Sequence, residues 1–241
     1  MKNAIITGAT GGIGIEIARK LADLGYDLAL VYGNNHTQAK ILVEELSEIT
    51  RVEAYSIDFL NADGYSLTLK RILKDFGSFE VLIHGAGVSY RDLFHEMTEL
   101  HFEELLSINL KPLYYISKEI IPRMIEEGKG SIISISSIWG SKPASMEVAY
   151  AMTKGALEQF TRSLASELSH MNIRVNAIAP GGVDTKLLAN LTDQEKRDFI
   201  EEIPFKRLAK PEEVAELAAF LIEKGTYITG QVLTMDGGFT L

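Results

Sequence analysis

Thr7-Gly8-Ala9-Thr10-Gly11-Gly12-Ile13-Gly14 lies between a short apolar run at residues 4–6 and a segment, residues 15–24, whose apolar residues recur at helical spacing. This order predicts a strand, a glycine-rich turn and a helix. Glycine adopts backbone angles closed to other residues and lets a ligand approach the main chain. The start of a helix offers unpaired N–H groups and a partial positive charge to a phosphate. The stretch therefore predicts a site for a dinucleotide pyrophosphate, or a tight turn without a ligand.

The rest of the chain repeats this alternation of apolar runs with helical segments. We expect further strands at residues 26–32, 51–57, 79–84, 131–136, 173–179 and 231–235. We expect helices at residues 37–48, 61–76, 98–127 with an interruption near Pro112, 150–170, 192–203 and 210–223. Near-continuous apolar strands that alternate with helices indicate a parallel sheet covered on both faces. Because no linker or internal repeat breaks the pattern, we predict one domain over residues 1–241.

The composition argues against several classes of function. A formal net charge of −9 disfavours nucleic-acid binding, which needs a basic surface. The chain has no cysteine, and its five histidines show no metal-binding spacing, so we expect no disulfide, thiolate or metal site. No apolar run is long enough to span a bilayer, and no signal peptide precedes the first strand. We therefore expect a cytoplasmic protein that binds neither metal nor membrane.

Small or polar residues follow each expected strand. They include Asn34, Asp58, the segment 85–87, Ser137 and the segment 180–182. Right-handed crossovers place the carboxyl ends of parallel strands at one edge of the sheet, where α/β proteins bind their ligands. Turn chemistry alone accounts for glycine and proline at such positions, but less well for Ser137 and Asp58. We therefore expect these residues to border a ligand crevice.

Tyr150 and Lys154 lie four residues apart in a strongly helical segment, so both side chains project from one face. A nearby cation favours the phenolate, so we expect Lys154 to lower the pKa of Tyr150 and make it an acid or base nearer neutral pH. Ser137 could hydrogen-bond the same substrate oxygen. The alternative is an exposed Tyr–Lys pair of the kind common on helices.

Together these motifs resemble those of the short-chain dehydrogenase/reductase family, and the resemblance covers essentially the whole chain. The matching positions are Thr7, Gly8, Gly12 and Gly14 of TGxxxGxG, the active-site Asn109, Ser137, Tyr150 with Lys154, and Pro180-Gly181 with Thr185. The resemblance implies an α/β fold, a Rossmann-like doubly wound sheet of seven parallel strands in the order 3-2-1-4-5-6-7. It also implies hydride transfer from a nicotinamide cofactor to a carbonyl carbon.

The resemblance assigns a role to each motif residue. Tyr150 donates a proton to the carbonyl oxygen, and Ser137 orients and polarises that oxygen. Lys154 lowers the pKa of Tyr150 and holds the nicotinamide ribose, while Asn109 supports a water-linked proton path. The implied cofactor-binding residues are Gly8, Thr10, Gly12, Ile13, Gly14, Asn34, Asp58, Phe59, Ala86, Gly87, Tyr150, Lys154, Pro180, Gly181, Val183 and Thr185. The implied substrate-binding residues are Ser137, Trp139, Tyr150 and Gly182.

Two positions depart from common family patterns. The usual Asn-Asn-Ala-Gly segment is His84-Gly85-Ala86-Gly87 here, and we interpret His84 as a packed, hydrogen-bonded residue at a strand end. Gly11 stands where NADP-dependent relatives often carry arginine. However, residues 32–35 hold no acid that would repel a 2′-phosphate, so NADP(H) is favoured over NAD(H). The expected phosphate contacts are Asn34, Asn35, His36 and Lys40.

The overall resemblance favours a 3-oxoacyl group on an acyl carrier protein as the substrate, with one alternative. The segments 203–208, 211–215 and 227–231 resemble bacterial 3-oxoacyl-(acyl-carrier-protein) reductases, which implies a carrier-bound thioester. Trp139, in Ser-Ser-Ile-Trp-Gly, and Glu147 instead resemble a branch that reduces a 5-aminopentanone group on elongation factor P. A carrier protein is acidic and needs a basic patch. The candidates for that patch are Arg91, Lys111, Arg123, Lys129 and Lys142.

A non-catalytic binding protein on the same scaffold is the other functional class, but such a protein is expected to have lost Tyr150 or Lys154, and both are present. The resemblance further implies a homotetramer, paired through the helices at 98–127 and 150–170 and through the last strand. The apolar candidates for these contacts are Leu157, Phe160, Leu164 and Phe239-Thr240-Leu241.

Overall fold

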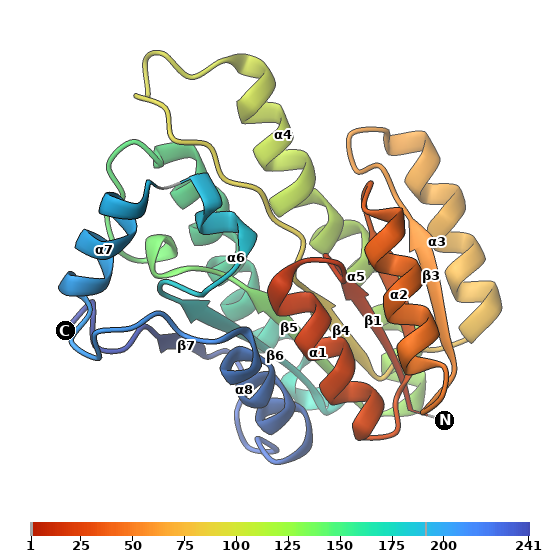
Figure 1. The fold of residues 1–241 in the computed structure, drawn as a ribbon. Helices are drawn as coiled ribbons and strands as arrows, with labels where there is room; N and C mark the ends of the chain where they lie inside the picture. Colours follow the sequence, from red (N-terminus) through yellow and green to blue (C-terminus); the bar gives the residue numbers. More distant parts are fainter. Residues whose placement is uncertain (1, 191) are drawn as a thin grey trace.

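The computed structural model describes residues 2–190 and 192–241, without the side chains at 62–65, 189 and 190. Seven parallel strands form one sheet in the order β3-β2-β1-β4-β5-β6-β7, with helices on both faces (Figure 1), so the predicted order is confirmed. The strands are β1 (Asn3–Thr7), β2 (Asp27–Tyr32), β3 (Val52–Ser56), β4 (Val81–His84), β5 (Gly130–Ile135), β6 (Ile173–Pro180) and β7 (Val232–Met235). The α-helices are α1 (Gly12–Asp23), α2 (His36–Leu46), α3 (Ala62–Phe76), α4 (Glu99–Asn109), α5 (Lys111–Glu127), α6 (Val148–Leu168), α7 (Asp193–Glu202) and α8 (Pro211–Glu223).

Two hydrophobic layers enclose the sheet because successive strand residues point to opposite faces. In β1, Ile6 packs with the buried residues of α1, α2 and α8, while its neighbour Ile5 packs with those of α3, α5 and α6. In β2, Leu30 packs on the same face as Ile6, and Val31 packs on the same face as Ile5. With both faces covered, a ligand can reach the backbone only at the edges of the sheet.

The long helical region predicted at residues 98–127 is two helices. Leu110 leaves the helical conformation between α4 and α5, and Pro112 occupies the first turn of α5, where its missing N–H costs no hydrogen bond. The break lies directly after Asn109, which it holds at the end of α4. Among the described residues no helix is long and apolar enough to cross a membrane.

Three short 3₁₀ helices were not predicted: η1 (Ile138–Gly140), η2 (Ser169–Met171) and η3 (Lys186–Asn190). In η1, the hydroxyl of Ser137 accepts a hydrogen bond from the backbone N–H of Trp139 at 3.2 Å. The turn therefore presents Ser137 and Trp139 side by side at the carboxyl end of β5. Single helical turns are too short to produce a periodic signal in the sequence.

Candidate active site

The glycine-rich stretch forms the turn between β1 and α1. Gly8 has a φ of +68°, and a Cβ added there would lie 2.5 Å from the carbonyl oxygen of Gly85. A Cβ at Gly14 would overlap the carbonyl oxygen of Gly8. Both positions therefore require glycine, which brings the turn against the loop after β4. Gly11 precedes α1 without a side-chain cap, and the first turn of α1 has no acidic residue, so its N–H groups face no competing anion.

The segment after β6 also meets this turn. A Cβ added at Gly12 would lie 2.8 Å from Cγ2 of Thr185. Gly181, next to Pro180, donates its N–H to the carbonyl oxygen of Met235 at 3.0 Å. Val183 is buried in the core, where the partly buried Ile13 packs against the same cluster. The fold thus brings together two cofactor-binding segments that lie about 170 positions apart in the sequence.

The remaining predicted cofactor residues lie at the ends of β2, β3 and β4. Asn34 is exposed after β2. Asp58 follows β3, where its carboxylate accepts a hydrogen bond from the N–H of Leu60 at 3.0 Å, and Phe59 packs against the core. This contact stabilises a local turn, which is the structural alternative to the predicted adenine contact of Asp58. Ala86 and Gly87 follow β4, with Ala86 buried. Thr10 lies half-buried in the glycine turn.

Ser137, Tyr150 and Lys154 are all buried and lie close together. The hydroxyl of Ser137 lies near enough to the phenol of Tyr150 to lower its pKa. Lys154 lies one helical turn further along α6, with its Nζ 5.5 Å from the centroid of the Tyr150 ring. The Nζ atom donates to the carbonyl oxygen of Ile135 at 2.9 Å and also lies against Gly87, where an added Cβ would be 3.5 Å away.

We expected Lys154 to lower the pKa of Tyr150. This expectation is wrong, because the pKa of Tyr150 is raised. Burial raises the pKa of Tyr150 above its usual range, and this outweighs the lowering by the Ser137 hydroxyl; the carboxylate of Glu147 raises it further. Burial also lowers the pKa of Lys154 to about 8, so the ammonium is itself near its titration point. Tyr150 is therefore held as a protonated phenol, the form that can donate a proton.

Asn109 clamps the loop after β4 to α6. Its side-chain Oδ1 accepts from the N–H of Val88 at 2.8 Å, and its Nδ2 donates to the carbonyl oxygen of Val88 at 3.0 Å and to the hydroxyl of Thr153 at 3.1 Å. Thr153 in turn donates to the carbonyl oxygen of Tyr150 at 2.7 Å. Asn109 is thus one residue removed from the backbone of Tyr150.

His84 is buried and bonded at both ring nitrogens, as expected for a packed residue at a strand end. Its Nε2 lies 2.8 Å from the carbonyl oxygen of Asn109, which can only accept, so Nε2 carries the proton. Nδ1 then accepts from the hydroxyl of Thr7 at 2.9 Å, and Thr7 accepts from the N–H of Ala86 at 3.3 Å. Burial lowers the pKa of His84 to about 4, an effect reinforced by the charge of Lys154.

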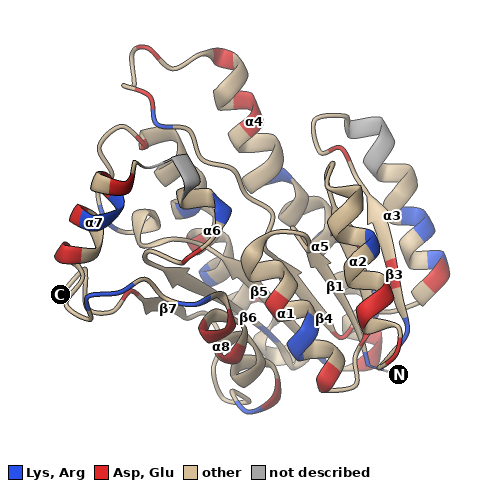
Figure 2. Cartoon of the chain, viewed as in Figure 1, with Lys and Arg blue, Asp and Glu red and all other residues tan. Residues whose placement is uncertain are grey.

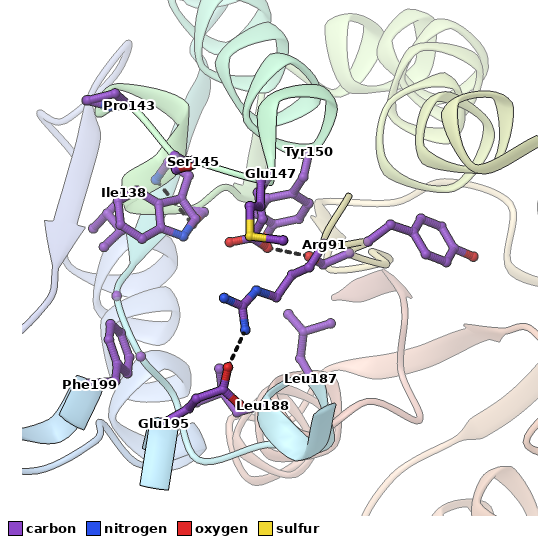
Figure 3. Close-up of a pocket in the computed structure, with 18 of the residues that line it drawn as sticks. Arg91, Ile138, Pro143, Ser145, Glu147, Tyr150, Leu187, Leu188, Glu195 and Phe199 are labelled. Carbon is purple, nitrogen blue, oxygen red and sulfur yellow. Dashed lines mark hydrogen bonds and ion pairs between the residues drawn. The ribbon is translucent and has the colours of Figure 1, made fainter. Parts of the chain in front are cut away.

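A cavity of about 880 Å³ opens in front of the two hydroxyls (Figure 3). All four predicted substrate residues, Ser137, Trp139, Tyr150 and Gly182, line it. Arg91, predicted as a docking residue, also lines it. The lining residues that we did not predict are Ser89, Tyr90, Ile138, Pro143, Ala144, Ser145, Met146, Leu187, Leu188, Glu195, Asp198, Phe199 and Glu202. Glu147 and Gly181 line it as well. The residues from α7 carry a signal in the sequence, because positions 195, 198, 199 and 202 share one helical face.

Carboxylates dominate the charged groups of this cavity. Glu147, Glu195, Asp198 and Glu202 line it together with a single cationic side chain, Arg91. Arg91 points across the opening and forms an ion pair with Glu195 at 3.2 Å, as Figure 3 shows. Glu147 accepts a hydrogen bond from the hydroxyl of Ser89 at 2.5 Å. The cavity therefore favours a cationic ligand group over an anionic one.

Comparisons with known proteins agree with this arrangement. A family profile described as Enoyl-(Acyl carrier protein) reductase matches residues 8–240. The chain is 39% identical over 241 residues to the oxidoreductase YmfI of Bacillus subtilis, covering 99% of this chain and 98% of the relative. It is 35% identical over 240 residues to the 3-oxoacyl-[acyl-carrier-protein] reductase FabG of Aquifex aeolicus, covering 98% of this chain and 96% of the relative.

Solved structures show the same fold. The 3-ketoacyl-(acyl-carrier-protein) reductase from Brucella melitensis, complexed with NADH, superposes with a TM-score of 0.90 at 28% identity, over 100% of this chain and 98% of that one. A protein from Beutenbergia cavernae described as an NAD(P) dependent gluconate 5-dehydrogenase, with bound NADP, gives a TM-score of 0.92 at 30% identity, over 99% and 96%. The chain is an oxidoreductase that belongs to the short-chain dehydrogenase/reductase family.

Proposed function

We propose that this chain is an NADPH-dependent reductase that converts a ketone to an alcohol. One observation carries the proposal: Ser137 and Tyr150 both line a cavity of about 880 Å³, and the Nζ of Lys154 lies 5.5 Å from the centroid of the Tyr150 ring. Two hydroxyls that converge on one point can bind a carbonyl oxygen and stabilise the negative charge it gains on reduction. A non-catalytic binding protein has no need of this arrangement.

The residues divide the work as follows. Tyr150, kept protonated by burial, donates its proton to the carbonyl oxygen. Ser137 holds that oxygen in place through its hydroxyl. Lys154 replenishes the proton and binds the cofactor ribose, and Asn109 fixes the turn of α6 that carries Tyr150. Burial excludes water from these groups, which strengthens each electrostatic contact.

The glycine turn fits a dinucleotide. The uncapped N–H groups at the start of α1 provide the hydrogen-bond donors that a pyrophosphate needs. The positions that only glycine can occupy let the backbone approach the pyrophosphate. The bound nicotinamide supplies the hydride for the carbonyl carbon. Gly8, Gly12 and Gly14 would lie along the pyrophosphate, with Thr185 beside them.

NADPH is proposed over NADH because the end of β2 carries no acid. Asn34 is exposed there, and Asn35 is occupied in capping α2 through the N–H of Gln38 at 3.2 Å. His36 lies 3.0 Å from the hydroxyl of Tyr32, so its ring also borders this edge. None of these groups carries a negative charge, so none repels a 2′-phosphate as an aspartate or glutamate would.

Of the two substrate classes, the cavity favours the amine-bearing ketone, such as the 5-aminopentanone group on elongation factor P. Its carboxylates outnumber its one cation, and that cation is already paired with Glu195. Figure 2 shows acidic residues on α7, and three of them, Glu195, Asp198 and Glu202, line the cavity. An ammonium group gains from this field, whereas an acidic carrier protein is repelled by it.

The five basic residues predicted for carrier docking do not form a patch at the cavity mouth. Arg91 alone lines the cavity. Arg123 donates to the carbonyl oxygen of Gly77, and Lys129 pairs with Glu80, so both lie at the opposite, amino edge of the sheet. The 3-oxoacyl thioester stays as the second candidate because relatives 33–35% identical over 240 residues carry that name.

A side-by-side assay of NADPH oxidation tests the substrate class. It compares an acetoacetyl thioester with elongation factor P that bears the 5-aminopentanone group. Glu202→Gln, which alters the cavity wall, should raise the KM for the amine-bearing ketone about threefold to tenfold without changing that for the thioester. Glu201→Gln is the matched control, since Glu201 pairs with Lys206 and does not line the cavity. Faster turnover of the thioester by the wild type would favour the second candidate.

We also propose a homotetramer. Tyr114 and Tyr115 of α5 and Phe220 of α8 are exposed, and Leu241 is fully exposed at the carboxyl end, so apolar surface is available on both predicted contact faces. Leu157, expected at an interface, is instead fully buried in the core. Phe160 and Leu164 pack partly against the same core cluster. Light scattering that gives the mass of a monomer would contradict the tetramer.

A further inference from the structure

The ring of Phe239, two residues before Leu241, lies between two aromatic side chains of the cavity wall, Trp139 and Phe199. Its centroid is 6.0 Å from that of Trp139, at an interplanar angle of 83°, and 5.3 Å from that of Phe199, at 60°. Trp139 and Phe199 both line the cavity, but Phe239 does not. Phe239 therefore touches the substrate site only through these two rings.

The tail that carries Phe239 is held firmly. The carboxylate of Asp236 accepts hydrogen bonds from the N–H of Gly238 at 2.9 Å, the N–H of Thr240 at 2.9 Å and the hydroxyl of Thr240 at 2.7 Å. Gly237 has a φ of +63°, and a Cβ added there would lie 2.9 Å from Cγ2 of Ile203. The tail is thus folded tightly against the end of α7, beside which Figure 1 shows the carboxyl end of the chain.

Apart from Phe199, two exposed ion pairs attach α7 to the body of the protein: Glu195 with Arg91 at 3.2 Å and Lys196 with Asp184 at 3.0 Å. Exposed ion pairs contribute little to stability. No side chain of α7, whose residues are all described, is buried. The Phe199 ring lies directly on the backbone of Gly182, where an added Cβ would overlap it. On its other side the ring meets Phe239. The position of α7 over the cavity therefore depends on a ring fixed between Gly182 and Phe239.

We infer that Phe239 is a positioning residue that sets the size of the substrate cavity, because it fixes the separation of Trp139 from α7. The inference rests on the proposed reductase function. Trp139 belongs to η1 and Phe239 follows β7, so two segments distant in the sequence meet at this ring contact. Removal of the Phe239 ring takes away a packing contact from both Trp139 and Phe199. Both side chains can then move apart, and the cavity widens without loss of any group that touches the substrate.

The test compares Phe239→Ala with Phe239→Tyr, which keeps the ring, and with Tyr227→Ala, which removes a fully exposed ring outside the tail. Two measurements are made on each. The chain has one tryptophan, so the emission of Trp139 and its quenching by acrylamide report the contact directly. Steady-state kinetics with ketones of increasing length report cavity size, and a fluorescence titration reports the Kd for NADPH.

For Phe239→Ala we expect red-shifted, more readily quenched emission and a KM for the shortest ketone raised about fivefold, with a smaller rise for longer ketones. The Kd for NADPH stays at the wild-type value, and Phe239→Tyr and Tyr227→Ala behave as wild type. A lower melting temperature with unchanged emission and an unchanged length profile would overturn the inference. Absence of ketone turnover in the wild type would overturn the proposed function instead, while the emission measurement still decides whether Phe239 holds Trp139. Phe239→Leu serves the same comparison if the alanine variant does not fold.

Discussion

The Nε2 atom of His84 lies 2.8 Å from the backbone carbonyl oxygen of Asn109, and this bond joins the end of β4 to the end of α4. The other ring nitrogen of His84, Nδ1, accepts a hydrogen bond from the hydroxyl of Thr7. Thr7 lies at the end of β1, beside the glycine turn. A neutral ring therefore links the proposed cofactor site to the residue that clamps the turn of Tyr150. The link is independent of the asparagines that the family usually carries in this segment.

Replacement of His84 by phenylalanine should lower the free energy of unfolding by about 2–3 kcal/mol, since it leaves the buried Thr7 hydroxyl without its acceptor and the buried Asn109 carbonyl without the imidazole donor. His84→Gln, whose amide can still donate toward Asn109, should recover part of the loss. Urea denaturation measures both. His95→Gln is the control because that side chain is 77% exposed, and it should change stability by less than about 0.5 kcal/mol. If His84→Phe changed the free energy of unfolding as little as the control does, the two hydrogen bonds of His84 would contribute little to stability.

The pKa of Lys154 predicts a pH dependence of stability. Its folded pKa of about 8 is below the usual 10.5, so between these values the unfolded chain binds more protons, and stability rises with pH. Below pH 8 both states are charged and the full cost of burial is present. The stability difference between the wild type and Lys154→Met should therefore shift by about 1–2 kcal/mol in favour of the wild type between about pH 7.5 and about pH 9.5. A constant difference would mean that Lys154 does not titrate in this range.

Asn34→Asp tests the cofactor choice. A carboxylate at the end of β2 repels a 2′-phosphate and can bind the 2′-hydroxyl of NADH, so the Kd for NADPH should rise about tenfold and that for NADH should fall. Fluorescence titrations with both cofactors measure the ratio. Asn35→Asp is the matched control, because that side chain caps α2 and an aspartate keeps the cap. If the Kd values for NADPH and NADH changed equally in the two variants, the effect would come from the added charge alone and not from a contact of residue 34.

Trp139→Val tests whether the indole limits the cavity. The smaller side chain should shift kcat/KM toward longer ketones, since the indole lines the cavity two residues beyond Ser137. Unchanged relative rates along a series of ketones would exclude this role. The Kd for NADPH serves as the internal control and should not change.

The motifs predicted much of this structure because they impose backbone geometry. The glycines at 8, 12 and 14 require a close approach of chain segments, and the spacing of Tyr150 and Lys154 places both on one face of α6. Depth of burial is not visible in spacing, so the direction of the Tyr150 pKa shift was predicted wrongly. The partner of His84 and the contact of Phe199 with the C-terminal tail depend on tertiary packing. Met146, a cavity residue with a φ of +63°, adopts a conformation that its side chain does not favour, so no local preference predicts it.

The most direct test of the account is NADPH oxidation by the wild type and by Tyr150→Phe, with an amine-bearing ketone and with an acetoacetyl thioester. Tyr150 is the proposed proton donor, so the phenylalanine variant should lose about 100-fold or more in kcat with at least one of these substrates. Its Kd for NADPH should stay near the wild-type value, because the ring and its packing are kept. Turnover by Tyr150→Phe at the wild-type rate would contradict the assignment of the acid and with it the proposed reductase mechanism.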